Sequence, residues 1–171
     1  DLVTEGGAVL PTLASGVPVT AGVERRYTWD GGGAGDGRYV VRAMIADALG
    51  ALSTAVAPVL IDTEPPTAVL SPPTPSATAR GPVVARVSST DPSGLSAATL
   101  TVASQTGLAI GRARMVIAAD GASASRRWNL RLRRRLLLPG VYRLVARVTD
   151  GAGNTATSTV RLLRVSRPVK A

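Results

Sequence analysis

Residues 142–149 read Tyr142-Arg143-Leu144-Val145-Ala146-Arg147-Val148-Thr149, and apolar and polar side chains alternate along them. In an extended strand this order places Tyr142 and Leu144 on one face and Arg143 and Arg147 on the other. Similar short runs recur between turn-forming clusters such as Asp30-Gly31-Gly32-Gly33 and Asp150-Gly151-Ala152-Gly153-Asn154. Alternating segments between closely spaced turns predict antiparallel sheets packed as a β-sandwich, and no segment predicts an amphipathic helix.

The arginine-rich segment upstream of this strand also alternates. Trp128, Leu130 and Leu132 are separated by the polar residues Asn129 and Arg131. We therefore predict a strand here that runs on to a turn at Pro139-Gly140 rather than a helix.

The sequence contains an internal repeat. A shift of 103 residues places Gly37–Val41 on Gly140–Leu144 without a gap. A tryptophan precedes the tyrosine in each copy, because Trp29 comes before Tyr39 and Trp128 before Tyr142. The repeat predicts two modules, each with a tryptophan in its core and a tyrosine whose hydroxyl ties a loop to the next strand.

The boundary between the modules is predicted at Asp62-Thr63-Glu64-Pro65-Pro66, since adjacent prolines cannot join a strand ladder and stiffen the chain. We divide the chain into a partial module at 1–62, a linker at 63–66, a second module at 67–167 and a tail at 168–171.

The first module contains the stretches Gly7–Leu13, Ala21-Gly22, Tyr27–Gly31 and Asp36–Tyr39. Through these four stretches, residues 1–52 resemble the immunoglobulin-like module of the bacterial flagellar hook-capping protein. Residues 61–165 resemble immunoglobulin-like repeats of bacterial surface proteins, in the stretches Ile61–Pro66, Asp91–Leu95 and Val148–Thr155. The resemblances imply two tandem immunoglobulin-like antiparallel β-sandwiches and an extracellular or cell-surface location. They are nearly silent on function.

The first module is expected to lack its N-terminal strands. If the second module starts near Thr67, the 103-residue shift would start the first module before Asp1. The resemblance agrees, because it places Asp1-Leu2-Val3 at a strand in the middle of the module. The missing strands would come from a neighbouring subunit or from an upstream segment; alternatively, the module is shorter or the sequence is a fragment.

Composition argues against an enzyme. The chain has no histidine and no cysteine, so the usual general base, thiol chemistry and the commonest metal ligands are missing. We expect no catalytic residues and no cofactor. No apolar run approaches the ~20 residues of a membrane span. The chain opens at Asp1 rather than at methionine, so we expect a processed product or a fragment.

Charge is divided unevenly along the chain. Residues 1–65 carry four arginines and eight acidic residues, whereas residues 66–171 carry sixteen basic and three acidic residues. The basic half supplies the candidate polyanion-binding residues, which are Arg126, Arg127, Arg131, Arg133, Arg134, Arg135, Arg143 and Arg147. Guanidinium groups bind carboxylate, sulfate and phosphate in a bidentate manner, so an acidic polysaccharide is a candidate ligand. Nucleic acid is less favoured because stacking aromatics are missing, and a solvated outer face is the competing interpretation.

Acidic turns offer a calcium hypothesis. The candidates are Asp62 and Glu64 in the linker, Asp91, and Asp150 with Asn154. Calcium needs six to eight oxygen ligands at one point. Asp and Asn in turns more often bond their own backbone, so we favour that role and predict no metal site.

Three functions remain open. The first is a structural or assembly module of a cell-surface complex or filament, with a protein partner or self-association between the acidic and basic halves. The second is an accessory module that binds an acidic glycan or cell-wall polymer. The third is an inert spacer.

Overall fold

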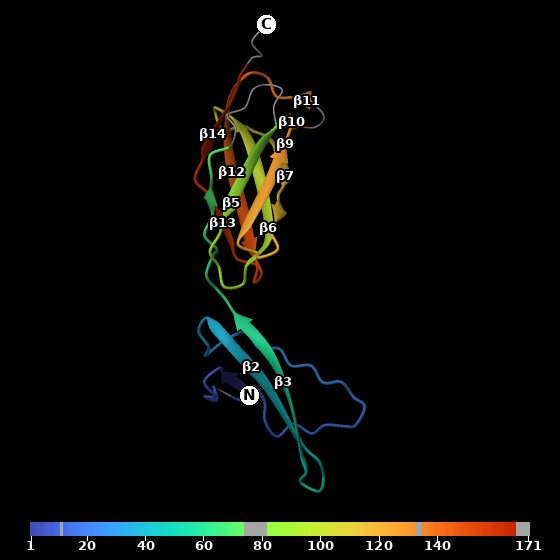
Figure 1. The fold of residues 1–171 in the computed structure, drawn as a ribbon. Helices are drawn as coiled ribbons and strands as arrows, with labels where there is room; N and C mark the ends of the chain where they lie inside the picture. The colour runs from blue at the N-terminus through green and yellow to red at the C-terminus, as the bar shows by residue number, and fades with distance from the viewer. Residues whose placement is uncertain (11, 74–81, 133–134, 167–171) are drawn as a thin grey trace. The chain divides into compact units, whose positions relative to one another are not determined.

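The computed structural model describes residues 1–10, 12–73, 82–132 and 135–166. These residues form fourteen β-strands in antiparallel sheets and no helix, which confirms the all-β prediction (Figure 1). The chain divides into two compact units, Asp1–Thr63 and Glu64–Ala171. Among the described residues, no helix has the length and apolar character needed to cross a membrane.

The first unit contains one three-stranded sheet in the order β1-β2-β3. Its strands are β1 (Leu2–Thr4), β2 (Gly37–Ala46) and β3 (Leu52–Ile61). A turn at Asp47 joins the two long strands, because the Asp47 Oδ1 accepts the backbone N–H groups of Leu49 at 2.8 Å and Ala51 at 2.9 Å. Within the described residues, β3 pairs with β2 along one edge and has no strand on the other.

Both faces of this sheet carry apolar side chains, and Arg38 and Arg42 lie on one of them. Val56 shares one face with Met44, while Ile45 lies on the opposite face. Strands with apolar side chains on both faces are typical of a sheet that is covered on both sides. Here Leu52 is 72% exposed and Val56 is 66% exposed, and Leu2 is the one buried apolar side chain among the described residues of this unit. Among its described residues, the first unit therefore has one sheet and no second sheet packed against it.

The second unit is a sandwich of two antiparallel sheets. One sheet has the order β4-β5-β9-β8, and its strands are β4 (Val69–Leu70), β5 (Val83–Ser88), β8 (Val116–Ile117) and β9 (Ser123–Trp128). The other has the order β13-β12-β6-β7 with β14 also on β12, and its strands are β6 (Leu95–Ser104), β7 (Ala109–Arg114), β12 (Gly140–Asp150), β13 (Thr155–Thr157) and β14 (Arg161–Val165).

Alternation along the strands builds the core between these two sheets. Leu144, Ala146 and Val148 are each at most 1% exposed, as the period of two in residues 142–149 predicts. They belong to one cluster with Val87 of β5 and other buried residues of the facing sheet. Burying each leucine or valine side chain contributes about 1.5–3 kcal/mol. Aliphatic side chains make up most of this core, which also contains Trp128, in a chain that has no phenylalanine.

The arginine-rich segment is not the single continuous strand that its alternation predicts. The strand β9 ends at Trp128, and Leu130 follows with a backbone φ of 62°. This left-handed conformation is rare for a leucine and reverses the chain. A separate hairpin then forms from β10 (Arg131–Leu132) and β11 (Arg135–Leu136). Because Leu130 is fully buried, its packing in the core holds the unusual conformation.

Two turns pack tightly at one end of the second unit. The backbone N–H of Gly151 donates to the carbonyl of Gly94 at 2.8 Å. A Cβ atom on Gly151 would lie 2.7 Å from the carbonyl oxygen of Ser93, so the approach requires glycine. This contact brings the turn after Asp91 against the turn after Asp150.

Candidate functional site

The predicted arginine candidates fall on different sheets of the second unit. Arg126 and Arg127 lie on β9 in the four-stranded sheet, and Arg131 lies on the β10–β11 hairpin. Arg133 and Arg134 lie outside the described residues, and Arg135 begins β11. Arg143 and Arg147 lie on β12, in the other sheet of the sandwich. The described candidates therefore lie on more than one sheet of the second unit.

Arg143 and Arg147 line an open groove on the outer face of the β12 sheet. The groove has a volume of about 630 Å³ and is also lined by Arg112 of β7. The middle strand β6 supplies part of its floor through Thr99 and Thr101. Ladder register positions these groups, because Arg147 pairs with Thr99 across β12 and β6, and Arg112 pairs with Thr101 across β6 and β7.

Arg112 is a groove residue that the sequence analysis missed. Its strand reads Ala109-Ile110-Gly111-Arg112-Ala113-Arg114, a short run that ends in a polar alternation. That alternation was a usable signal for an outward arginine. The sequence does not show that β7 pairs with β6, which is the fact that places Arg112 beside Thr101.

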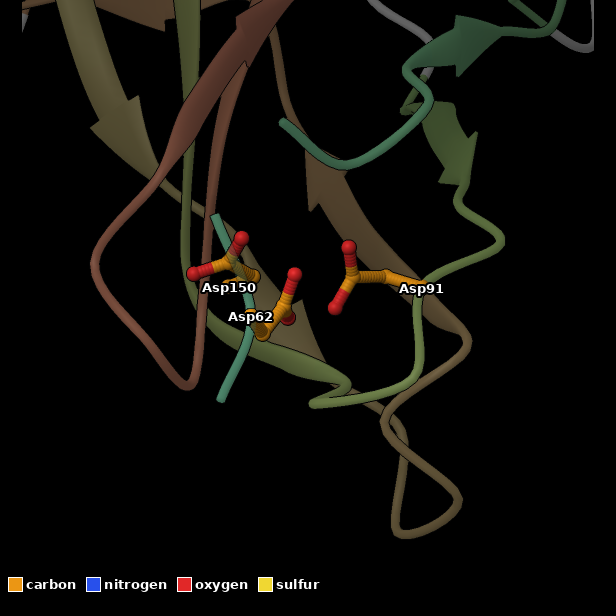
Figure 2. A group of neighbouring side chains, drawn as sticks. All are labelled: Asp62, Asp91 and Asp150. Carbon is orange, nitrogen blue, oxygen red and sulfur yellow. The ribbon is translucent and has the colours of Figure 1, made fainter. Parts of the chain in front are cut away.

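The calcium candidates are divided between the two units. Asp62 is the penultimate residue of the first unit, whereas Glu64 and Asp150 belong to the second. Figure 2 shows Asp91 and Asp150 within the second unit, and their carboxylate oxygens approach within 4.8 Å of each other. Each residue uses Oδ1 for its own turn, as expected for aspartates in turns.

The two turns differ in the hydrogen bonds that their aspartate carboxylates accept. The Asp91 Oδ1 accepts the N–H of Ser93 at 2.9 Å, and the Asp150 Oδ1 accepts the N–H groups of Gly153 at 2.6 Å and Asn154 at 2.8 Å. The Asp150 side chain is 0% exposed, and its Oδ2 atom has no hydrogen-bond partner among the described residues. A buried carboxylate oxygen in this state costs stability unless its charge is compensated.

The repeated aromatic residues make the same bonds in both units. The Tyr39 hydroxyl donates to the carbonyl of Gly35 at 2.8 Å, and the Tyr142 hydroxyl donates to the carbonyl of Leu138 at 2.6 Å. Each tryptophan donates from Nε1 to the carbonyl three residues later, at 3.2 Å for Trp29 and 2.7 Å for Trp128. Trp128 is buried, but Trp29 is half-buried because the first unit has no core for it to anchor.

The strand order defines the fold of the second unit. Strands β4-β5-β9-β8 match the A-B-E-D sheet of immunoglobulin sandwiches, and β6 beside β12 with β14 on its other side matches C-F-G. Tyr142 then lies near the start of strand F, where such sandwiches carry a corner tyrosine. The unit is an immunoglobulin-like β-sandwich.

Comparison with known proteins agrees on the fold and goes no further. No protein-family model and no curated protein sequence match the chain. A solved structure of dimeric latent PorU from Porphyromonas gingivalis matches with a TM-score of 0.51 and 15% identity, over 80% of this chain and 13% of PorU. The chain therefore spans a small part of that protein, and the likeness concerns the fold alone.

Two further structures match less closely. The fibronectin(III)-like modules of Clostridium thermocellum CbhA give a TM-score of 0.44 and 21% identity, over 79% of this chain and 65% of theirs. CopC from Methylosinus trichosporium OB3b gives 0.42 and 16%, over 61% of this chain and 99% of its own.

Proposed function

We propose that this chain is a non-catalytic assembly module of an extracellular or cell-surface bacterial complex or filament, in which a neighbouring copy completes the first unit with a β-strand. The observation that carries the proposal is the uncovered sheet of that unit. Leu52, Val56 and Met44 are more than half exposed on strands that carry apolar side chains on both faces. Apolar strands of this kind are stable when a second layer covers them.

The edge of β3 offers the place for the added strand. Its ten residues, Leu52–Ile61, pair with β2 along one edge, and the other edge has no partner among the described residues. An incoming strand would satisfy the unpaired backbone groups of this edge and bring side chains toward the apolar faces.

Charge favours contact between copies. The acidic first part of the chain and the basic second part attract one another when copies meet head to tail. The resemblance of residues 1–52 to the hook-capping module, and of residues 61–165 to surface-protein repeats, supports an extracellular place for such an assembly.

Sedimentation velocity of the full chain over a range of concentrations and ionic strengths tests the proposal. We expect oligomers at low ionic strength that dissociate as salt screens the charges. Replacing Leu52→Lys and Val56→Lys together should give a monomer, because lysine ammonium groups resist burial in the contact.

The matched control carries Leu108→Lys and Val116→Lys in the second unit. These side chains are 74% and 68% exposed, close to the exposures of the test pair, so the added charge and lost apolar area are alike. The control should still assemble. A monomer at every concentration in low salt would overturn the proposal, as would a soluble, monomeric and cooperatively folded 1–65 fragment.

A further inference from the structure

The groove on the outer face of the β12 sheet lies wholly within the second unit and does not depend on assembly. Three guanidinium groups border it, from Arg112, Arg143 and Arg147. Arg143 and Arg147 are four residues apart on β12, which separates them by roughly 13 Å along the strand. Arg112 lies two strands away, on the far side of β6, at roughly 10 Å across the sheet. The three positive charges therefore surround the groove floor.

The floor of the groove combines threonine hydroxyl groups with small apolar side chains. Thr99 and Thr101 of β6 and Thr149 of β12 line it together with small residues such as Ala97 and Ala103. Small side chains leave space between the arginines, and threonine hydroxyls both donate and accept hydrogen bonds. The groove can accept a polar chain lying across the strands.

No negative charge neutralises these arginines within the sheet. The five strands that form it contain one acidic residue, Asp150, and that side chain is fully buried. The Arg147 Nη2 makes a long hydrogen bond of 3.4 Å to the Thr155 hydroxyl. Arg112 and Arg143 make no side-chain hydrogen bond or ion pair with any described residue. Guanidinium groups without a protein partner can donate their hydrogen bonds to a bound anion.

We propose that this groove binds a linear acidic polysaccharide, whose carboxylate groups pair with Arg112, Arg143 and Arg147 and whose hydroxyl groups bond the threonines of the floor. Guanidinium forks match carboxylates in a bidentate manner. A protein partner is disfavoured because the floor offers none of the large apolar or aromatic anchors that dominate protein interfaces. Single-stranded nucleic acid is disfavoured because no aromatic side chain lines the groove for base stacking.

Calorimetric titration of the full chain with oligogalacturonate at physiological ionic strength tests the site. Removing all three charges by Arg112→Gln, Arg143→Gln and Arg147→Gln should weaken binding at least about tenfold, since the loss of even one charged hydrogen bond lowers affinity by about that factor. A second variant, Thr101→Tyr, fills the floor without changing the charge, and we expect about the same loss. The substituted residues lie on the outer face of the sheet, and tyrosine is well tolerated in strands.

The matched control removes three charges from the other sheet by Arg86→Gln, Arg126→Gln and Arg127→Gln. These residues are exposed on β5 and β9, so the net charge falls equally and binding should stay within about twofold. Equal losses in the two triple variants would overturn the site in favour of diffuse attraction. So would unchanged binding by Thr101→Tyr, tighter binding of polyglutamate or single-stranded DNA, equal binding of neutral dextran, or no binding of oligogalacturonate.

Discussion

The Tyr142 hydroxyl reaches back four residues to the carbonyl of Leu138, and Tyr39 makes the same bond to Gly35. The repeated sequence pattern is therefore a repeated bond. In the second unit this bond fixes the loop that leads into β12, the strand that carries Arg143 and Arg147. It connects the local fold of the chain to the position of the groove.

Replacing Tyr142→Phe should lower the free energy of unfolding by about 1 kcal/mol, because one hydrogen bond is lost at a partly exposed position. Urea denaturation followed by tryptophan fluorescence measures the change. Tyr27→Phe is the control, since the Tyr27 side chain is 57% exposed and its hydroxyl has no partner among the described residues. Equal effects of the two changes would show that the bond contributes nothing.

Replacing Gly151→Ala should destabilise the second unit by about 1–3 kcal/mol, since the new methyl group must displace the Ser93 carbonyl. Gly140→Ala, at the start of β12, is the control, because its Cβ would meet Tyr142 at an ordinary 3.9 Å. Thermal unfolding of both variants makes the comparison. A Gly151→Ala protein as stable as the parent would mean that the two turns separate freely.

Substitutions of Asp150 test whether its carboxylate only holds the turn or also binds a cation. With a chelator present, Asp150→Ala should lose about 1–3 kcal/mol, because the N–H groups of Gly153 and Asn154 lose their acceptor. Asp150→Asn keeps the accepting oxygen and removes one of two neighbouring negative charges, so its stability should equal or exceed that of the parent. Urea denaturation measures both.

The same urea denaturation experiments, repeated with calcium, complete this test. The turn-bonding role predicts no change in the parent protein. A rise in its unfolding midpoint that Asp150→Asn abolishes would show that the buried Oδ2 is a cation ligand.

A fragment of residues 64–171 should fold on its own with the unfolding midpoint of the main transition of the full chain. Nearly all buried apolar side chains of the described residues lie in that unit, so the first unit adds little to its stability. Circular dichroism melts of both proteins check this. A fragment that melts well below the full chain would show that the proposed division at 63–66 cuts through a single cooperative unit.

Alternation predicted which side of a strand a residue occupies but not the sheet to which the strand belongs. It placed Leu144 and Arg143 correctly on opposite faces of β12. It could not show that Arg127 and Arg147 belong to different sheets, because strand pairing joins residues far apart in the chain. It also passed over Leu130, whose left-handed backbone is held by burial and not by local propensity.

The groove illustrates the same limit. Arg143 and Arg147 were recognised as outward arginines, but Arg112 enters the site through its pairing with Thr101. The incomplete first module was expected from the repeat offset, whereas the degree to which its apolar strands are exposed required the structure.

The course of the chain through the second unit has a mechanical consequence. The chain enters at Thr67, which bonds Thr90 near the Asp150 end of β12, and it leaves at Val165, which pairs with Gly140 at the other end. Tension along the polypeptide would therefore pull β14 lengthwise against β12. The hydrogen bonds of that ladder would resist the tension together in shear rather than opening one after another.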